Sequence, residues 1–146
     1  MRRVLIIGTL FLTVTSIASA QATVVVPDTM PAAVVQRFVD AANSRDARAI
    51  AALVAPDASF ERFPGGGVLV QGRDSIQTYY ARILATLSAD FRITVQPRTV
   101  EGQLVIDQEH YTGMPPSQNQ TTWMYLVRRG LIQRAWLLEG ASPRAQ

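Results

Sequence analysis

His110 is the first residue in this chain whose type points to chemistry. It is the single histidine, and the ordinary pKa of histidine lies near neutral pH, so it could act as a general acid or base or hydrogen-bond a ligand. It lies in the polar segment 107–112, which we expect to form a strand. Alternation along a strand predicts two faces: Ile106, Gln108, His110 and Thr112 on one, and Asp107, Glu109 and Tyr111 on the other.

Asp107 and Glu109 form a second candidate group. Two carboxylates that lie two residues apart on a strand share a face, which is a pattern typical of paired acid and base groups. The alternative is that they lie on the outer face, where they are solvated or paired with an arginine such as Arg92 or Arg134. A register shift of one residue would instead bring both carboxylates inward.

The composition excludes several other kinds of site. The 146 residues contain one His, no Cys and 14 basic residues, all of which are Arg. Without Cys there is no disulfide, thiol nucleophile or thiolate metal site, and a single His argues against an ordinary zinc site. Without Lys there is no Schiff base and no P-loop lysine. We therefore expect a protein that uses neither a metal nor an organic cofactor.

Residues 1–20 have the pattern of a secretory signal peptide. A charged start, Met1-Arg2-Arg3, precedes an apolar stretch over 4–17 and the small residues Ala18-Ser19-Ala20. A membrane anchor is the alternative, but the apolar stretch is shorter than the roughly 20 residues that cross a bilayer. We expect cleavage after Ala20 and export to the periplasm or the medium, with no membrane partner afterward.

The chain left by this cleavage is nearly neutral. It keeps twelve arginines against eleven acidic residues, and the arginines are scattered from Arg37 to Arg144. Nucleic-acid binding requires a concentrated basic surface. We therefore expect no nucleic-acid partner.

The periodicity of the sequence after the predicted signal peptide predicts an α+β fold. Three helices are expected, from Pro31 to the break at Asn43, from Asp46 to Val54, and from Asp74 or Ser75 to Leu87. Extended segments are expected over 59–63, 68–70, 91–96, 103–112, 121–128 and 131–139, the last four in meander order. Helices followed by antiparallel strands favour a curved antiparallel sheet covered on one face by three helices. We expect a leader over 21–30, one domain over 31–140 and a tail over 141–146.

Four short strings, in this order and spacing, resemble those of a known family. They are RFVD at 37–40, PDASFE at 56–61, QGRDSI at 71–76 and GLIQ at 130–133. The chain resembles a SnoaL-like, ketosteroid-isomerase-like member of the nuclear transport factor 2-like superfamily. The resemblance implies a cone-shaped half-barrel with an apolar pocket between sheet and helices, and often a homodimer formed through the outer sheet face.

The resemblance also allows the catalytic positions of the ketosteroid isomerases to be checked. The oxyanion-binding tyrosine falls on Phe38, the general-base aspartate on Arg62, and the protonated aspartate on Trp123 or Met124. The catalytic set is therefore not retained, although a shift of one residue would place Glu61 at the base position. A steroid isomerase that uses the family mechanism is not expected.

The resemblance turns the His110 face of its strand toward the pocket and matches Tyr80 to a supporting tyrosine, so His110 and Tyr80 are the catalytic candidates. The predicted ligand-binding residues are Phe38, Phe60, Arg62, Tyr79, Gln108, Thr112, Trp123 and Leu137. Inside the pocket, the always-charged Arg62 would need a carboxylate partner or would attract an anionic head group, while the alternative places it at the rim.

Three functions follow from these observations. The first is an exported protein whose apolar pocket binds a small hydrophobic molecule. The second is a cofactor-free lyase, hydratase or isomerase that uses His110 as acid or base, and the third is a structural or interaction module whose pocket is filled by its own side chains. Both faces of segment 131–139 are largely apolar, so we also expect a homodimer that packs sheet on sheet.

Overall fold

The computed structural model describes residues 29–138. The predicted signal peptide, most of the leader over 21–30 and the tail over 141–146 lie outside these residues. The described elements follow one another along the chain as α1 (Pro31–Asn43), α2 (Ala47–Ala52), β1 (Val54–Phe63), β2 (Val68–Gln71), α3 (Arg73–Thr86), β3 (Arg92–Glu101), β4 (Leu104–Thr112), the short 3₁₀ helix η1 (Pro116–Gln118), β5 (Gln120–Arg128) and β6 (Leu131–Leu138).

The six strands form one open, curved sheet in the order β2-β1-β6-β5-β4-β3. All neighbours are antiparallel except β1 and β6, which run parallel. The α+β class with three covering helices is confirmed, but the sheet is mixed rather than purely antiparallel. The sequence could not show this, because β1 and β6 are distant in the chain and become neighbours only when the meander curls back.

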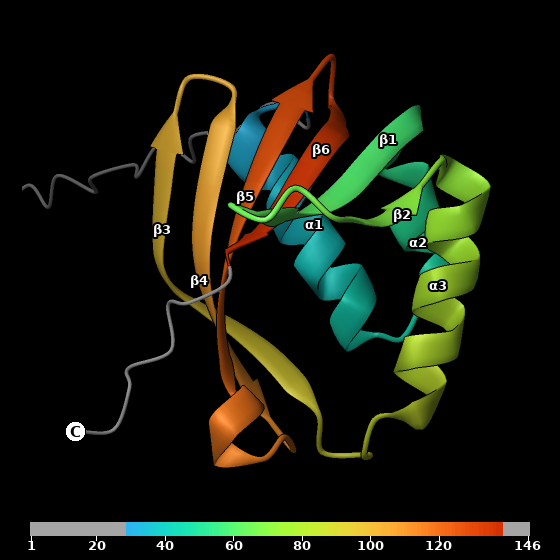
Figure 1. Ribbon diagram of the computed structural model, residues 1–146, viewed down its shortest axis with the longest axis vertical. Coiled ribbons are helices and arrows are strands. Elements are labelled where there is room, and N and C mark those ends of the chain that lie inside the picture. The colour runs from blue at the N-terminus through green and yellow to red at the C-terminus, as the bar shows by residue number, and fades with distance from the viewer. Residues whose placement is uncertain (1–28, 139–146) are drawn as a thin grey trace, which may run out of the picture.

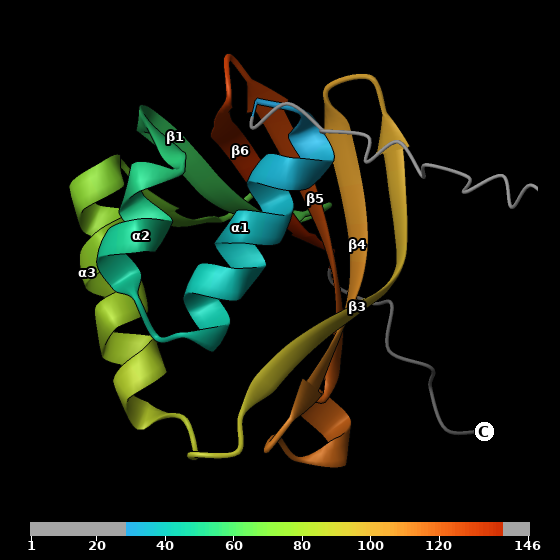
Figure 2. The same ribbon diagram turned by 180° about the vertical axis from the view of Figure 1, so that it is seen from behind.

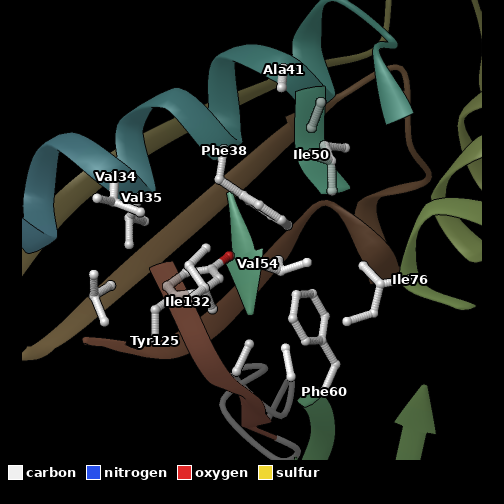
Figure 3. Packing of buried hydrophobic residues seen from close by; sticks show 14 of the residues in the cluster. Val34, Val35, Phe38, Ala41, Ile50, Val54, Phe60, Ile76, Tyr125 and Ile132 are labelled. Carbon is white, nitrogen blue, oxygen red and sulfur yellow. The ribbon is translucent and has the colours of Figure 1, made fainter. Parts of the chain in front are cut away.

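The three helices cover one face of the sheet. Figures 1 and 2 show α1 lying across this face, with α3 near β1 and β2 and with β3 and β4 on the opposite side of the molecule. The core lies between the two layers, and Figure 3 shows Val34 and Phe38 of α1, Phe60 of β1, Ile76 of α3 and Tyr125 of β5 converging there. Each element thus presents one apolar face to the same interior.

The end of α1 is fixed to the sheet by a side chain. Asn43 donates from its Nδ2 to the carbonyl oxygen of Ile93 at 3.0 Å and accepts from the Ile93 amide at 2.7 Å. Arg45, two residues later, donates to the carbonyl oxygens of Leu84, Leu87 and Ser88 near the end of α3. These bonds set the spacing between α1, α3 and β3.

The second predicted helix is shorter than expected. The pattern predicts a helix from Asp46 to Val54, but α2 ends at Ala52 and Val54 begins β1. The Asp46 side chain caps the helix by accepting from the Ala49 amide at 2.8 Å. Val54 instead pairs with Ile132, which draws the chain into the sheet. None of the helices in residues 29–138 has the length and apolarity needed to cross a bilayer.

A buried ion pair joins α1 to two strands. Arg98 of β3 lies directly across from Asp107 of β4 and donates to its two carboxylate oxygens at 2.7 Å each, from Nε and Nη2. Its Nη1 donates to Gln36 Oε1 at 2.9 Å and to the Ala32 carbonyl oxygen at 3.3 Å on α1. The Asp107 side chain is fully buried and that of Arg98 is 19% exposed.

We predict that Arg98→Met destabilises the fold strongly, because Asp107 then remains as a buried charge without its partner. The free energy of unfolding in urea should fall by roughly 3 to 5 kcal/mol. Arg48→Met, which removes an exposed arginine from α2, is the control and should cost far less. The double variant Arg98→Met with Asp107→Leu should recover much of the loss. Equal stability of the Arg98 and Arg48 variants would contradict this role.

Candidate functional site

A cavity of about 190 Å³ lies between the helices and the sheet. Eight of the seventeen residues in its wall are aromatic, most of the others are aliphatic, and one carries a carboxyl group. From α1 to β5 they are Phe38, Val39, Ala42, Phe60, Leu69, Tyr79, Tyr80, Ile83, Leu84, Leu87, Phe91, Ile93, Glu109, Tyr111, Met114, Trp123 and Tyr125. The wall is thus an aromatic enclosure around one acidic side chain.

Helical and strand periodicity bring the aromatic residues together. On α3, Tyr80, Ile83 and Leu84 recur at the spacing of one helix face, and Leu87, directly after the helix, continues the wall. The Tyr80 ring meets the Phe38 ring edge to face, with centroids 5.5 Å apart. On β5, Trp123 and Tyr125 share a face and stack at 6.1 Å.

Glu109 is the polar centre of this pocket. It is 3% exposed, and both of its carboxylate oxygens accept hydrogen bonds from tyrosines. The Tyr111 hydroxyl donates to Oε2 at 2.7 Å and the Tyr125 hydroxyl donates to Oε1 at 2.8 Å. Tyr111 lies two residues further along β4, on the same face as Glu109, while Tyr125 reaches the carboxylate from β5.

Burial shifts the pKa of Glu109 to an unusual value. The pKa is raised from 4.5 to about 7 in total: removal from water is the main cause and the nearby Asp107 charge adds to it, while the two tyrosine hydrogen bonds and the Arg98 charge act in the opposite direction. The pKa values of Tyr80, Tyr111 and Tyr125 are raised mainly by burial and also by the Glu109 charge. Glu109 can therefore take up or release a proton near neutral pH, which suits an acid or base.

The described residues contain no cluster of three or more His, Cys, Asp or Glu side chains that could hold a metal ion. Glu109 and Asp107 lie on one face of β4, but Asp107 is bound by Arg98 rather than directed into the cavity. The chemistry that this wall offers is thus that of one carboxyl group with hydroxyl neighbours.

The family of the chain follows from comparison with known proteins. The family described as the SnoaL-like domain matches residues 35–135. The chain belongs to the SnoaL-like domain family. A comparison of this SnoaL-like domain with curated proteins found no match.

Solved structures share the fold at low sequence identity. A cystatin-fold protein from Novosphingobium aromaticivorans superposes with a TM-score of 0.63 at 16% identity, covering 75% of this chain and 96% of that one. A putative polyketide cyclase from Sinorhizobium meliloti gives 0.60 at 23% identity, with 71% and 92% covered. A putative ketosteroid isomerase from Kribbella flavida gives 0.57 at 21% identity, with 82% and 84% covered. At these identities the superpositions show a shared fold, in agreement with the family assignment.

The structure reverses the predicted faces of β4. Gln108, His110 and Thr112 are exposed on the face turned away from the helices, and Glu109 and Tyr111 line the cavity. The prediction that His110, Gln108 and Thr112 face the pocket is therefore wrong. The register alternative holds for Glu109, whereas Asp107 is buried on the same face but does not line the cavity. The reason is that Arg98 holds Asp107 inward, and side chains two residues apart must follow it.

The predicted pairing of Asp107 with Arg92 or Arg134 is also wrong. Neither Arg92 nor Arg134 pairs with it, because Arg98 occupies the position directly across the β3–β4 ladder. Arg98 and Tyr125 are the residues that sequence analysis missed. The pairing of Arg98 with Asp107 follows the register set by the turn after Glu101, in which Glu101 lies across from Leu104, and the bulge between Val95 and Arg98 changes the register only beyond Arg98.

Four of the predicted ligand contacts line the cavity, namely Phe38, Phe60, Tyr79 and Trp123, and so does the catalytic candidate Tyr80. Arg62 and Leu137 do not. Arg62 is exposed near the end of β1, in line with the rim alternative, because the strand leaves the cavity after Phe60. Leu137 is half-buried on β6, next to Arg62 in the parallel ladder. Whether the wall residues contact a ligand stays a prediction.

The raised pKa of Glu109 predicts a specific pH dependence of stability. Since the folded protein holds this proton more tightly than the unfolded chain, the free energy of unfolding should decline as pH rises from about 4.5 to about 7, by about 3 kcal/mol in total. Urea unfolding of Glu109→Gln at a series of pH values should lack this decline. The control, Glu101→Gln, removes an exposed carboxyl and should retain it. The same decline in both variants would rule out a buried titration at Glu109.

Proposed function

We propose that this SnoaL-like domain binds a small, largely apolar organic molecule in the cavity and directs the polar group of that molecule toward Glu109. The observation that carries the proposal is the cavity itself, about 190 Å³ in volume and lined mainly by aromatic and aliphatic side chains. A cavity of about 150 Å³ with an apolar wall is sufficient to hold benzene. The volume therefore suits a molecule of about one ring.

The composition of the wall supports binding of such a molecule. Small-molecule sites commonly combine an apolar wall with a few placed polar groups, and here Glu109 with its two tyrosine donors supplies them. The open volume counts against the alternative of a module whose pocket is filled by its own side chains.

The alternative of a cofactor-free lyase, hydratase or isomerase that acts through His110 stays a prediction. The position of His110 gives it no support, because the side chain is exposed on the face of β4 that is turned away from the cavity. A direct contact with a molecule inside the cavity would require the strand to turn over. Any acid or base role at this site falls on Glu109 instead.

Filling the cavity with a larger side chain should weaken ligand binding. Ile83 lines the cavity from α3, so Ile83→Trp fills it with a larger ring and should weaken binding of ethylbenzene by at least about tenfold in calorimetry. The control is Ala81→Trp, which adds the same side chain at an exposed position of α3 and should bind as the parent does. Absence of binding in the parent, or equal binding in both variants, would contradict the proposal.

We further propose that the protein is exported after cleavage at Ala20 and forms a dimer through the outer sheet face. The N-terminal pattern supports the first point. The second is supported by Ile106, Met124 and Trp136, which lie in register across β4, β5 and β6 on the face without helices.

One mass measurement tests both proposals. A native mass spectrum of the protein taken from the exported fraction should give twice the mass of a chain that begins at Gln21. Trp136→Glu should give the monomer mass, because it places a charge in the apolar contact. A monomeric parent would exclude the dimer, and an intact N-terminus would exclude cleavage.

A further inference from the structure

Among residues 29–138, those that line the cavity include a carboxyl group and no cation. None of these seventeen residues is arginine or histidine. Arg98 acts on Glu109 through space, but its guanidinium makes its hydrogen bonds to Asp107, Gln36 and Ala32. An ionised Glu109 thus places a negative charge against the cavity without an oppositely charged group in the wall.

The hydrogen bonds of Glu109 fit its ionised form. Tyr111 and Tyr125 donate to separate oxygens, so both oxygens serve as acceptors, as they do in a carboxylate. A carboxylate offers about four lone-pair sites, so two remain for further donors. A group that brings both N–H donors and a positive charge would satisfy these sites and the charge together.

The rings around the cavity suit the same kind of group. Phe38, Phe60, Tyr80, Trp123 and Tyr125 all contribute to the wall, and four of the five are connected through Phe38 by centroid distances of 5.5 to 5.9 Å. The faces of aromatic rings attract cations, most strongly where water is excluded. The same rings accept the apolar body of a ligand.

We propose that the molecule bound in this cavity is a small protonated amine with an apolar, ring-sized body, whose ammonium group pairs with the Glu109 carboxylate. This inference rests on the proposed function and names the ligand class of that site. A neutral carbonyl or hydroxyl compound is the competing class, and it would use Glu109 as a protonated hydrogen-bond donor.

The two classes differ in the sign of their pH dependence. Five charged or titratable groups face Glu109: Tyr80 from α3, Arg98 from β3, Asp107 and Tyr111 from β4, and Tyr125 from β5. The residues that α1 contributes to the cavity wall are apolar, namely Phe38, Val39 and Ala42. Raised pKa values keep the tyrosines protonated near neutral pH, and Asp107 is paired with Arg98. Among these groups, Glu109 is therefore the one whose charge changes between about pH 6 and about pH 8.

Three probes of nearly equal shape test the proposal. Benzylamine, benzyl alcohol and ethylbenzene end in an ammonium, a hydroxyl and a methyl group, and benzylamine stays protonated over this pH range. Calorimetric titration should show that benzylamine binds most tightly at about pH 8 and about tenfold more weakly at about pH 6, since the ionised fraction of Glu109 falls by that factor. Ethylbenzene should show no comparable loss at the lower pH.

A charge-neutral variant provides the second arm. Glu109→Gln should lower the affinity for benzylamine at about pH 8 by at least about tenfold and remove its pH dependence, while ethylbenzene binding reports that the cavity is intact. Glu101→Gln, which alters the net charge equally at an exposed site, should bind benzylamine as the parent does. If Glu109→Gln does not fold, the pH dependence of benzylamine binding to the parent still tests whether the ligand is an amine.

The outcomes separate this inference from the proposed function. The proposal of an amine ligand would be overturned if ethylbenzene binds but benzylamine is not preferred, or if benzyl alcohol binds more tightly as pH falls. Either result would still support the proposal that the cavity binds a small molecule. Failure of all three probes to bind the parent would overturn both proposals.

Discussion

The ion pair between Arg98 and Asp107 holds α1 against β3 and β4. It joins a fully buried carboxylate to a guanidinium that also reaches two groups on α1. Because Asp107 points toward the helices, the two-residue period of β4 directs Glu109 and Tyr111 to the same side. The position of Glu109 in the cavity thus depends on an ion pair between two residues that do not themselves line the cavity.

Burial of Glu109 is unfavourable for folding at neutral pH. The carboxyl group has lost most of its water, and its hydrogen bonds to Tyr111 and Tyr125 offset this loss only in part, as the raised pKa shows. An amide at this position would avoid the charge. A residue that lowers stability while facing an open cavity is a feature more typical of a functional site than of a core.

The SnoaL-like fold is present here with a different polar centre from the one that the resemblance to ketosteroid isomerases implies. Phe38 and Trp123, at positions matched to catalytic groups, contribute rings to the wall, and Arg62 lies outside it. The acidic group comes from β4 and its donors from β4 and β5. The fold therefore provides the cavity, and the side chains of individual strands decide its chemistry.

The sequence by itself determined the α+β class, the order of helices and strands, and the residues that share each face. Phe38 and Tyr80 on helices, and Phe60 and Trp123 on strands, could be predicted in the wall because periodicity and family resemblance agree on them. Only the tertiary structure decided that β1 lies parallel to β6 and which face of β4 turns inward. Periodicity shows which side chains share a face, but the inward face is selected by contacts distant in the chain, here from Arg98 on β3 and Tyr125 on β5.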